Sequence, residues 1–108
     1  MRQFLEHRAV LPVSAAPTAG LCELLSALGQ ETRLSIVRKL LDGGPRSVNA
    51  LAEELDILQN GASTHLTILA RAGLVVAERR GSQRIYHARR ETVEYLIGVL
   101  ENMLRHAD

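Results

Sequence analysis

The sequence lacks the features that mark disulfide-rich, secreted and membrane proteins. Its 108 residues include one cysteine, Cys22, which can form neither an internal disulfide nor a zinc cluster. No stretch approaches the roughly 20 apolar residues needed to span a bilayer, and residues 1–20 have no apolar segment typical of a signal peptide. We therefore expect a soluble, cytoplasmic protein.

Catalytic and cofactor-binding motifs are also absent. The sequence contains no glycine-rich phosphate loop followed by lysine, no nucleophile elbow and no Cys/His pair at metal-ligand spacing. The adjacent carboxylates Glu53 and Glu54 fall on a predicted helix whose residues mostly serve packing. The sequence thus predicts a protein that is not an enzyme and that carries no cofactor and no metal.

Basic charge is concentrated in one part of the chain. The net charge is only +1, and the 13 basic residues are all arginine except one. Between positions 71 and 90 the only acidic residue is Glu78. Such a local excess of positive charge is typical of a phosphate-binding face, although a solvated basic surface would show the same pattern. The arginines of this stretch are Arg71, Arg79, Arg80, Arg84, Arg89 and Arg90.

Most of the chain has the period of amphipathic helices. Residues 1–16 show no clear period, and we expect them to form an arm before a single domain over residues 17–108. Apolar stripes at helical spacing then predict three helices. The first stripe contains Leu21, Leu24, Leu25 and Leu28, the second Leu34, Val37, Leu40 and Leu41, and the third Val48, Leu51, Ala52 and Leu55.

Residues 59–72 form the most informative predicted helix, which has an apolar stripe of Ala62, Leu66, Leu69 and Ala70. Its opposite face is polar but uncharged, whereas a solvent-facing helix surface usually carries charged residues. Short amide and hydroxyl side chains suit the base edges and phosphate oxygens of the DNA major groove. The candidate DNA contacts on this face are Gln59, Asn60, Ser63, Thr64 and Thr67.

The last third of the chain predicts a hairpin and a terminal helix. Residues 74–88 read as two strands joined by a turn at Gly81–Gln83. Arg79, Arg80 and Arg84 lie on its arms and tip, where a guanidinium suits a phosphate. From about Glu91 an apolar stripe at helical spacing runs to the end of the chain.

The order of these elements is that of a winged helix-turn-helix. A short helix, a turn at Asp56–Leu58, a helix with a polar uncharged face and an arginine-rich hairpin follow one another. The fold class we expect is mainly α, with five helices and a two-stranded wing. Residues 59–72 would then form the recognition helix, and the hairpin would follow the DNA backbone or the adjacent minor groove.

The first turn of the predicted recognition helix lacks good helix-forming residues, and the helix contains one histidine. Leu58 precedes the helix and cannot cap it, and Gly61 lies in its first turn. This turn is therefore expected to be weakly held. His65 falls at the border of the apolar stripe, which favours a structural histidine over a base contact or a metal ligand.

The sequence resembles the arsenic-repressor (ArsR/SmtB) family of bacterial transcriptional repressors. The resemblance rests on LGQETRL at 28–34, LAEEL at 51–55, STHLTIL at 63–69, AGLV at 72–75, and ERRG at 78–81 followed by Ile85 and Tyr86. It implies a homodimeric repressor whose first and last helices form the dimer interface and whose effector relieves DNA binding. The expected interface residues are Leu21, Leu24, Leu25, Leu28, Val93, Leu96, Ile97, Leu100 and Leu104.

The resemblance also bears on partners and effector. A two-fold dimer predicts double-stranded DNA with an imperfect palindromic operator as its partner. Family members carry thiolates where this chain has Ser47 and Asn49, and histidines where it has Val93 and Leu104. We therefore expect an effector other than a metal at either site. Cys22 is a candidate redox or effector residue, or simply a small residue near the interface.

One alternative from another class remains open at this point. A dimeric protein-interaction module, such as an anti-activator, could keep the winged-helix fold without binding DNA.

Overall fold

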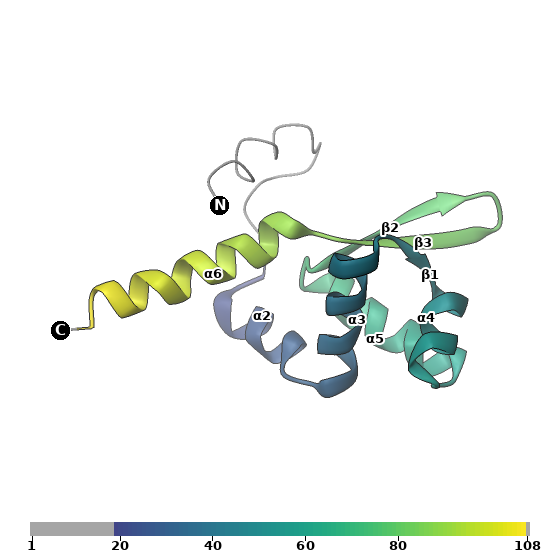
Figure 1. The fold of residues 1–108 in the computed structure, drawn as a ribbon, viewed down its shortest axis with the longest axis horizontal. Helices are drawn as coiled ribbons and strands as arrows, with labels where there is room; N and C mark the ends of the chain where they lie inside the picture. The colour runs from purple at the N-terminus through teal and green to yellow at the C-terminus, as the bar shows by residue number, and fades with distance from the viewer. Residues whose placement is uncertain (1–18, 108) are drawn as a thin grey trace.

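The computed structural model describes residues 19–107, and within them the chain forms five helices and three strands (Figure 1). The expected mainly α winged helix-turn-helix with five helices is confirmed. The predicted arm over residues 1–16 lies outside the described residues. The elements are α2 (Leu21–Leu28), α3 (Glu31–Gly43), β1 (Arg46–Ser47), α4 (Val48–Leu55), α5 (Gln59–Arg71), β2 (Val75–Arg80), β3 (Gln83–Ala88) and α6 (Arg90–Arg105).

The expected two-stranded wing is confirmed as the β2–β3 hairpin, and the short β1 adds a third antiparallel strand to the sheet in the order β1-β3-β2. β1 pairs Arg46 with Tyr86 and ties the start of α4 to the base of the wing. A strand of two residues is too short to show an alternating pattern, which is why the sequence did not reveal it. At the wing turn, Gly81 has a φ of 60°, a conformation that glycine adopts without strain.

The core lies between α2, α3, α4, α5 and the base of the wing. Two residues expected in it are instead exposed: Leu34, at 45% exposure, and Ala70. Ile36 is fully buried, and Leu34 lies about 200° from it around α3, so the two cannot share one face. Ala70 follows the buried Leu69 by one residue, about 100° around α5.

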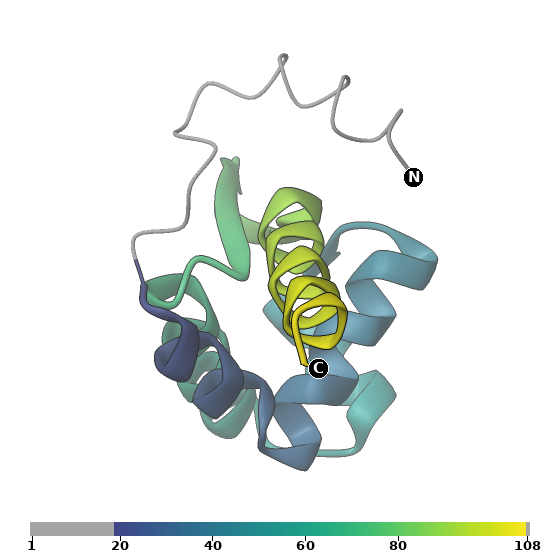
Figure 2. The same cartoon turned by 90° about the vertical axis from the view of Figure 1, so that its left-hand side faces the viewer.

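The last helix is anchored at its first turn and projects from the body at its other end. The buried Thr92 hydroxyl donates to the Gly73 carbonyl at 2.7 Å, and Arg89 pairs with the buried Glu91 at 2.8 Å. Residues 100–107 are exposed. α6 and the wing extend in opposite directions (Figure 1), and Figure 2 looks nearly along α6. No helix within residues 19–107 is long and apolar enough to cross a membrane.

Candidate nucleic-acid interface

The turn between α4 and α5 sets the direction of the recognition helix. Asp56 closes α4 in the left-handed conformation, which Asp tolerates better than most residues, and its amide donates to α4 carbonyls. The next amide, of Ile57, donates to the Ala52 carbonyl at 3.0 Å. On the inner side of α5, Ala62, Leu66 and Leu69 are fully buried. The helix is therefore held from both its entry turn and its inner face.

The outer face of α5 carries all five predicted major-groove contacts. Their side chains are all exposed: Gln59, Asn60, Ser63, Thr64 and Thr67. The Thr64 hydroxyl donates to the Asn60 carbonyl, and Thr67 donates in the same way to Ser63, each at 3.0 Å. With the hydroxyl protons engaged, these threonines offer oxygen lone pairs to adenine or cytosine amino groups and methyl groups to thymine.

The first turn of α5 has no side-chain cap. Leu58 occupies the N-cap position, is 81% exposed and makes no capping hydrogen bond. As expected from the sequence, the free amides of the first turn have no side-chain partner. Amides at a helix N-terminus attract anions, so this end of α5 can accept a DNA phosphate.

His65 is a half-buried link between three helices, in keeping with its expected structural role. Its Nδ1 lies 3.3 Å from Nη1 of Arg33, and Arg33 also donates from Nε to the Ala27 carbonyl of α2 at 2.7 Å. Burial, and to a lesser extent the Arg33 charge, lower the pKa of His65 below its ordinary value. The neutral imidazole therefore accepts from Arg33 and ties α5 to α3 and α2.

The wing presents two exposed arginines that face each other. Arg79 and Arg84 are directly opposite in the β2–β3 register. Neither guanidinium makes an ion pair or hydrogen bond within residues 19–107. Like charges directly opposite on a sheet are unfavourable unless a counter-charge lies between them. Two phosphate oxygens would supply that charge.

Arg80, the third predicted wing contact, is partly neutralised. Its Nε lies 3.2 Å from Oε2 of Glu78, whose other oxygen contacts Nε2 of His87 at 2.6 Å. The hydrogen bond from Arg80, and next that from His87, lower the pKa of Glu78. The charge of Arg80 is therefore less available for DNA than those of Arg79 and Arg84.

A groove of about 210 Å³ joins the wing turn to the starts of α4 and α5. Asn49, Ser82 and Gln83 line it beside Gln59 and Arg84, and the sequence reasoning did not assign them to DNA contact. Ser47 also lines the groove, and it caps α4 by accepting a hydrogen bond from the Ala50 amide at 3.1 Å. The groove connects the start of the recognition helix to the turn of the wing.

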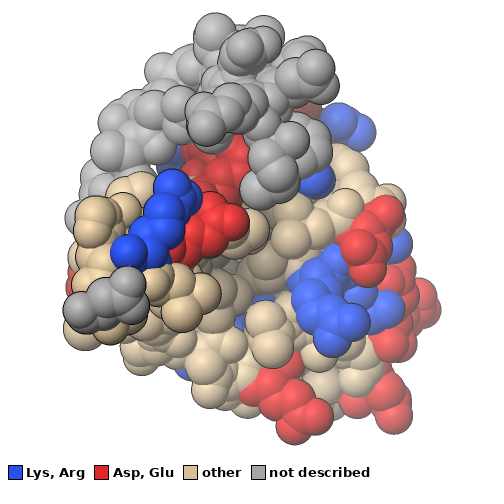
Figure 3. Space-filling view, turned by 60° about the vertical axis from the view of Figure 1, so that its left-hand side comes forward, with Lys and Arg blue, Asp and Glu red and all other residues tan. Residues whose placement is uncertain are grey.

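The expected interface residues divide into exposed and buried sets. Leu25, Ile97 and Leu100 are exposed, and Leu104 is 79% exposed. Leu21, Leu28 and Val93 are half-buried. Figure 3 shows an uncharged surface at the α6 end of the molecule, between two charged clusters in which acidic and basic side chains lie together.

Two of the expected interface residues belong to the hydrophobic core of the single chain instead. Leu24 is fully buried and Leu96 is 5% exposed, because both face the body where α2 and the first half of α6 pack. The interface assignment is corrected for these two. Met103 and Tyr95, which are not among the expected interface residues, are also exposed on α6.

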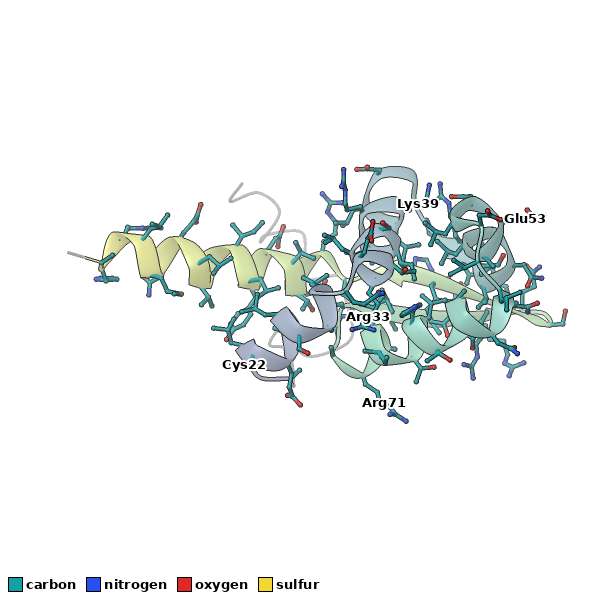
Figure 4. All side chains as sticks on the ribbon, turned by 90° about the horizontal axis from the view of Figure 1, so that it is seen from below. Cys22, Arg33, Lys39, Glu53 and Arg71 are labelled. Carbon is teal, nitrogen blue, oxygen red and sulfur yellow. The ribbon has the colours of Figure 1, made fainter. Side chains whose placement is uncertain are left out.

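The family's two metal positions hold no ligand cluster in the described part of the chain. Within residues 19–107 no group of three His, Cys, Asp or Glu side chains is placed to hold a metal ion. Cys22 is exposed on α2 (Figure 4). Its thiol is thus open to solvent rather than packed in the core.

Comparison with known proteins relates this geometry to regulators. A family described as a helix-turn-helix domain matches residues 28–78. An HTH-type transcriptional regulator from Methanocaldococcus jannaschii is 32% identical over 81 residues, covering 75% of this chain and 91% of that protein. The HTH-type transcriptional repressor SmtB of Mycobacterium tuberculosis is 41% identical over 64 residues, covering 59% of this chain and 47% of that protein.

A solved structure agrees with the fold. The solution structure of a homodimeric winged helix-turn-helix DNA-binding domain from Mycobacterium bovis, a possible ArsR-family transcriptional regulator, is 28% identical. It matches with a TM-score of 0.64 and covers 82% of each chain. The chain therefore belongs to the ArsR/SmtB family of winged helix-turn-helix transcriptional regulators, which bind DNA and are not enzymes.

Proposed function

We propose that this regulator is a homodimeric repressor that acts in the cytoplasm and binds an imperfect palindromic operator. The observation that carries the proposal is the uncharged polar face of α5 beside a wing with two unpaired, opposed arginines, within residues 19–107. A helix of short hydrogen-bonding side chains reads bases, and arginines without counter-charges bind phosphates.

Each element has a distinct part in this proposal. Gln59, Asn60, Ser63, Thr64 and Thr67 contact bases or phosphates in the major groove. Arg79 and Arg84 bind the backbone beside it, with Arg80 contributing less because Glu78 holds it. Phosphate contacts supply affinity for any sequence, whereas base contacts supply selectivity.

The dimer in this proposal forms through the exposed apolar residues of α2 and α6. Leu25, Ile97, Leu100, Met103 and Leu104 lie on the surface of a single chain. Burying a leucine or isoleucine contributes roughly 1.5–3 kcal/mol. The M. bovis relative is described as homodimeric, and two-fold symmetry of the protein implies two-fold symmetry in the operator.

The effector in this proposal is not a metal at either family site. Ser47 and Asn49 offer no thiolate, and Val93 and Leu104 offer no imidazole. Tight, stoichiometric zinc, nickel or arsenite binding that releases DNA and persists in Cys22→Ser would contradict this part.

Selection of bound genomic fragments followed by gel-shift titration tests the proposal. We expect selected fragments to contain an imperfect palindrome and to bind far more tightly than unrelated DNA. Thr64→Ala should change the preference at particular base pairs by about 1–3 kcal/mol. Absence of DNA binding even at low salt would contradict the proposal and favour a protein-interaction module.

A further inference from the structure

We propose that a pocket between α2 and the end of α5 binds a small organic carboxylate, and that this ligand weakens DNA binding. The second part rests on the proposed function. The pocket has a volume of about 380 Å³, within the range of sites for small ligands. It is lined by Ala27 of α2, by the alanines just before α2 and just after α5, and by Glu23, Ser26, Arg33, Ile68 and Arg71.

Two arginines give the pocket a positive end. Arg33 reaches it from α3, where its Nε and Nη1 bonds to Ala27 and His65 fix the guanidinium between α2 and α5. Arg71 comes from the last turn of α5 and lies at the exposed rim of the pocket, with its side chain extending away from the helix (Figure 4). Neither forms an ion pair with a carboxylate of the described residues.

Glu23 is the one acidic group among the described lining residues, and it is already engaged. Glu23 accepts a hydrogen bond from the Gly20 amide at 2.9 Å, as part of the start of α2. Two guanidiniums against one carboxylate leave the pocket with an excess of positive charge. Arginine nitrogens that remain free suit a carboxylate, which they can bind with two parallel hydrogen bonds.

The rest of the lining selects an anion with an apolar body. Ile68 and the alanine methyl groups offer no hydrogen bonds, so an inorganic anion would leave this wall in contact with water. A cation is disfavoured by the arginines. A monocarboxylate with a small ring or short chain satisfies both ends of the pocket.

The pocket is connected to the DNA-binding face through its arginines. Arg33 contacts His65 of the recognition helix, and Arg71 belongs to that helix. A bound carboxylate neutralises positive charge beneath α5, which lowers the attraction for DNA phosphates. Because coupling between two sites is reciprocal, DNA should weaken carboxylate binding by the same factor.

Titration of the protein alone with benzoate tests the site. Benzamide serves as the neutral analogue, and amide chemical shifts locate the binding. We expect saturable binding of benzoate but not of benzamide, with shifts confined to α2 and the end of α5. Equal binding of both compounds, or shifts scattered over the surface, would overturn the assignment.

Three variants separate this pocket from general attraction of anions. Arg71→Gln should weaken benzoate binding by about threefold or more, as expected for a partly exposed ion pair. Ser26→Phe keeps every charge but fills the pocket, and should abolish binding. Arg38→Gln removes an exposed arginine outside the pocket and should leave binding unchanged. An equal loss in Arg38→Gln and Arg71→Gln would overturn the proposal.

The coupling is tested by fluorescence anisotropy with a selected operator, with sodium chloride matching the ionic strength of sodium benzoate. Benzoate should weaken operator binding by the wild-type protein but not by Ser26→Phe. An operator affinity that is the same with and without bound benzoate would overturn the coupling. Benzoate binding in a protein that binds no DNA would uphold the pocket and contradict the proposed function instead.

Discussion

His65 is the residue whose protonation most directly affects how the recognition helix is held. Its neutral Nδ1 accepts from Arg33, which also reaches the carbonyl of Ala27 in α2. A proton on Nδ1 would remove that hydrogen bond and place two positive charges side by side. The contact between α5, α3 and α2 therefore depends on an uncharged imidazole.

This dependence predicts a loss of stability in mild acid. The pKa of His65 in the folded chain is lowered from 6.5, so the unfolded chain takes up the proton first as pH falls. Its contribution to the free energy of unfolding is complete above about pH 6.5 and decreases as pH falls toward the folded pKa. Denaturant unfolding between pH 7.5 and 5 should show a smaller decrease for His65→Gln than for wild type. The control His106→Gln, at the exposed end of α6, should behave as wild type; equal curves for all three proteins would contradict the role of His65.

The wing arginines differ in how far their charge is available, which predicts unequal effects on DNA. Arg84→Ala should weaken binding to all sequences and reduce the slope of log affinity against log salt by about one. Arg80→Ala should reduce that slope less, because Glu78 already pairs with Arg80. Titrations at four or more salt concentrations measure both slopes. If Arg84→Ala changed the preferred sequence and left the slope intact, the assignment of Arg84 to phosphate would be wrong.

The recognition helix is the element with the least local support at its start. Leu58 is exposed and cannot accept from the first-turn amides. Leu58→Ser should therefore raise the free energy of unfolding by about 0.5–2 kcal/mol, because a serine hydroxyl caps a free amide and little apolar burial is lost. Chemical denaturation measures the change. Leu58→Ala, which shortens the side chain without adding a cap, is the control; a gain of the same size in both variants would argue against capping.

The sequence revealed the elements far better than the contacts between them. The recognition helix was predicted over residues 59–72 and spans Gln59–Arg71, because its apolar stripe and polar face are both local patterns. β1 was missed because two residues carry no period, and the pairing of Arg80 with Glu78 was missed because it depends on side-chain geometry within the wing. The groove residues Asn49 and Gln83 are brought together only by the tertiary fold. Contacts between residues far apart in the chain produce no local pattern from which a single sequence could predict them.

On the scale of the whole molecule, the projecting half of α6 is an apolar surface that no other element within residues 19–107 covers. From Leu100 to the end of the helix every side chain is exposed, whereas Leu96 is packed in the core. Most of the stability of a helix in a protein comes from packing its apolar face, and the second half of this 16-residue helix has no such packing within one chain's described residues. Association through this half of α6 is the arrangement that would cover it.

Substitutions in the two halves of α6 should therefore have different outcomes. Leu100→Glu combined with Leu104→Glu should give a folded monomer, because neither side chain belongs to the core of one chain. Leu96→Glu should unfold the protein, because it buries a charge in that core. Sedimentation velocity and circular dichroism together distinguish these results. A wild-type chain that sediments as a monomer at micromolar concentration would contradict the proposed dimer.

The bond between Thr92 and Gly73 has a consequence for operator geometry. It fixes the first turn of α6 to the loop that ends α5, and the Arg89 amide adds a second bond to the Leu74 carbonyl at 2.9 Å. In a dimer joined through α6, the distance between the two recognition helices is then set by rigid helix rather than by a flexible linker. Inserting about 5 base pairs between the half-sites turns one of them to the opposite side of the duplex. A dimer with rigidly spaced recognition helices could then no longer contact both half-sites at once.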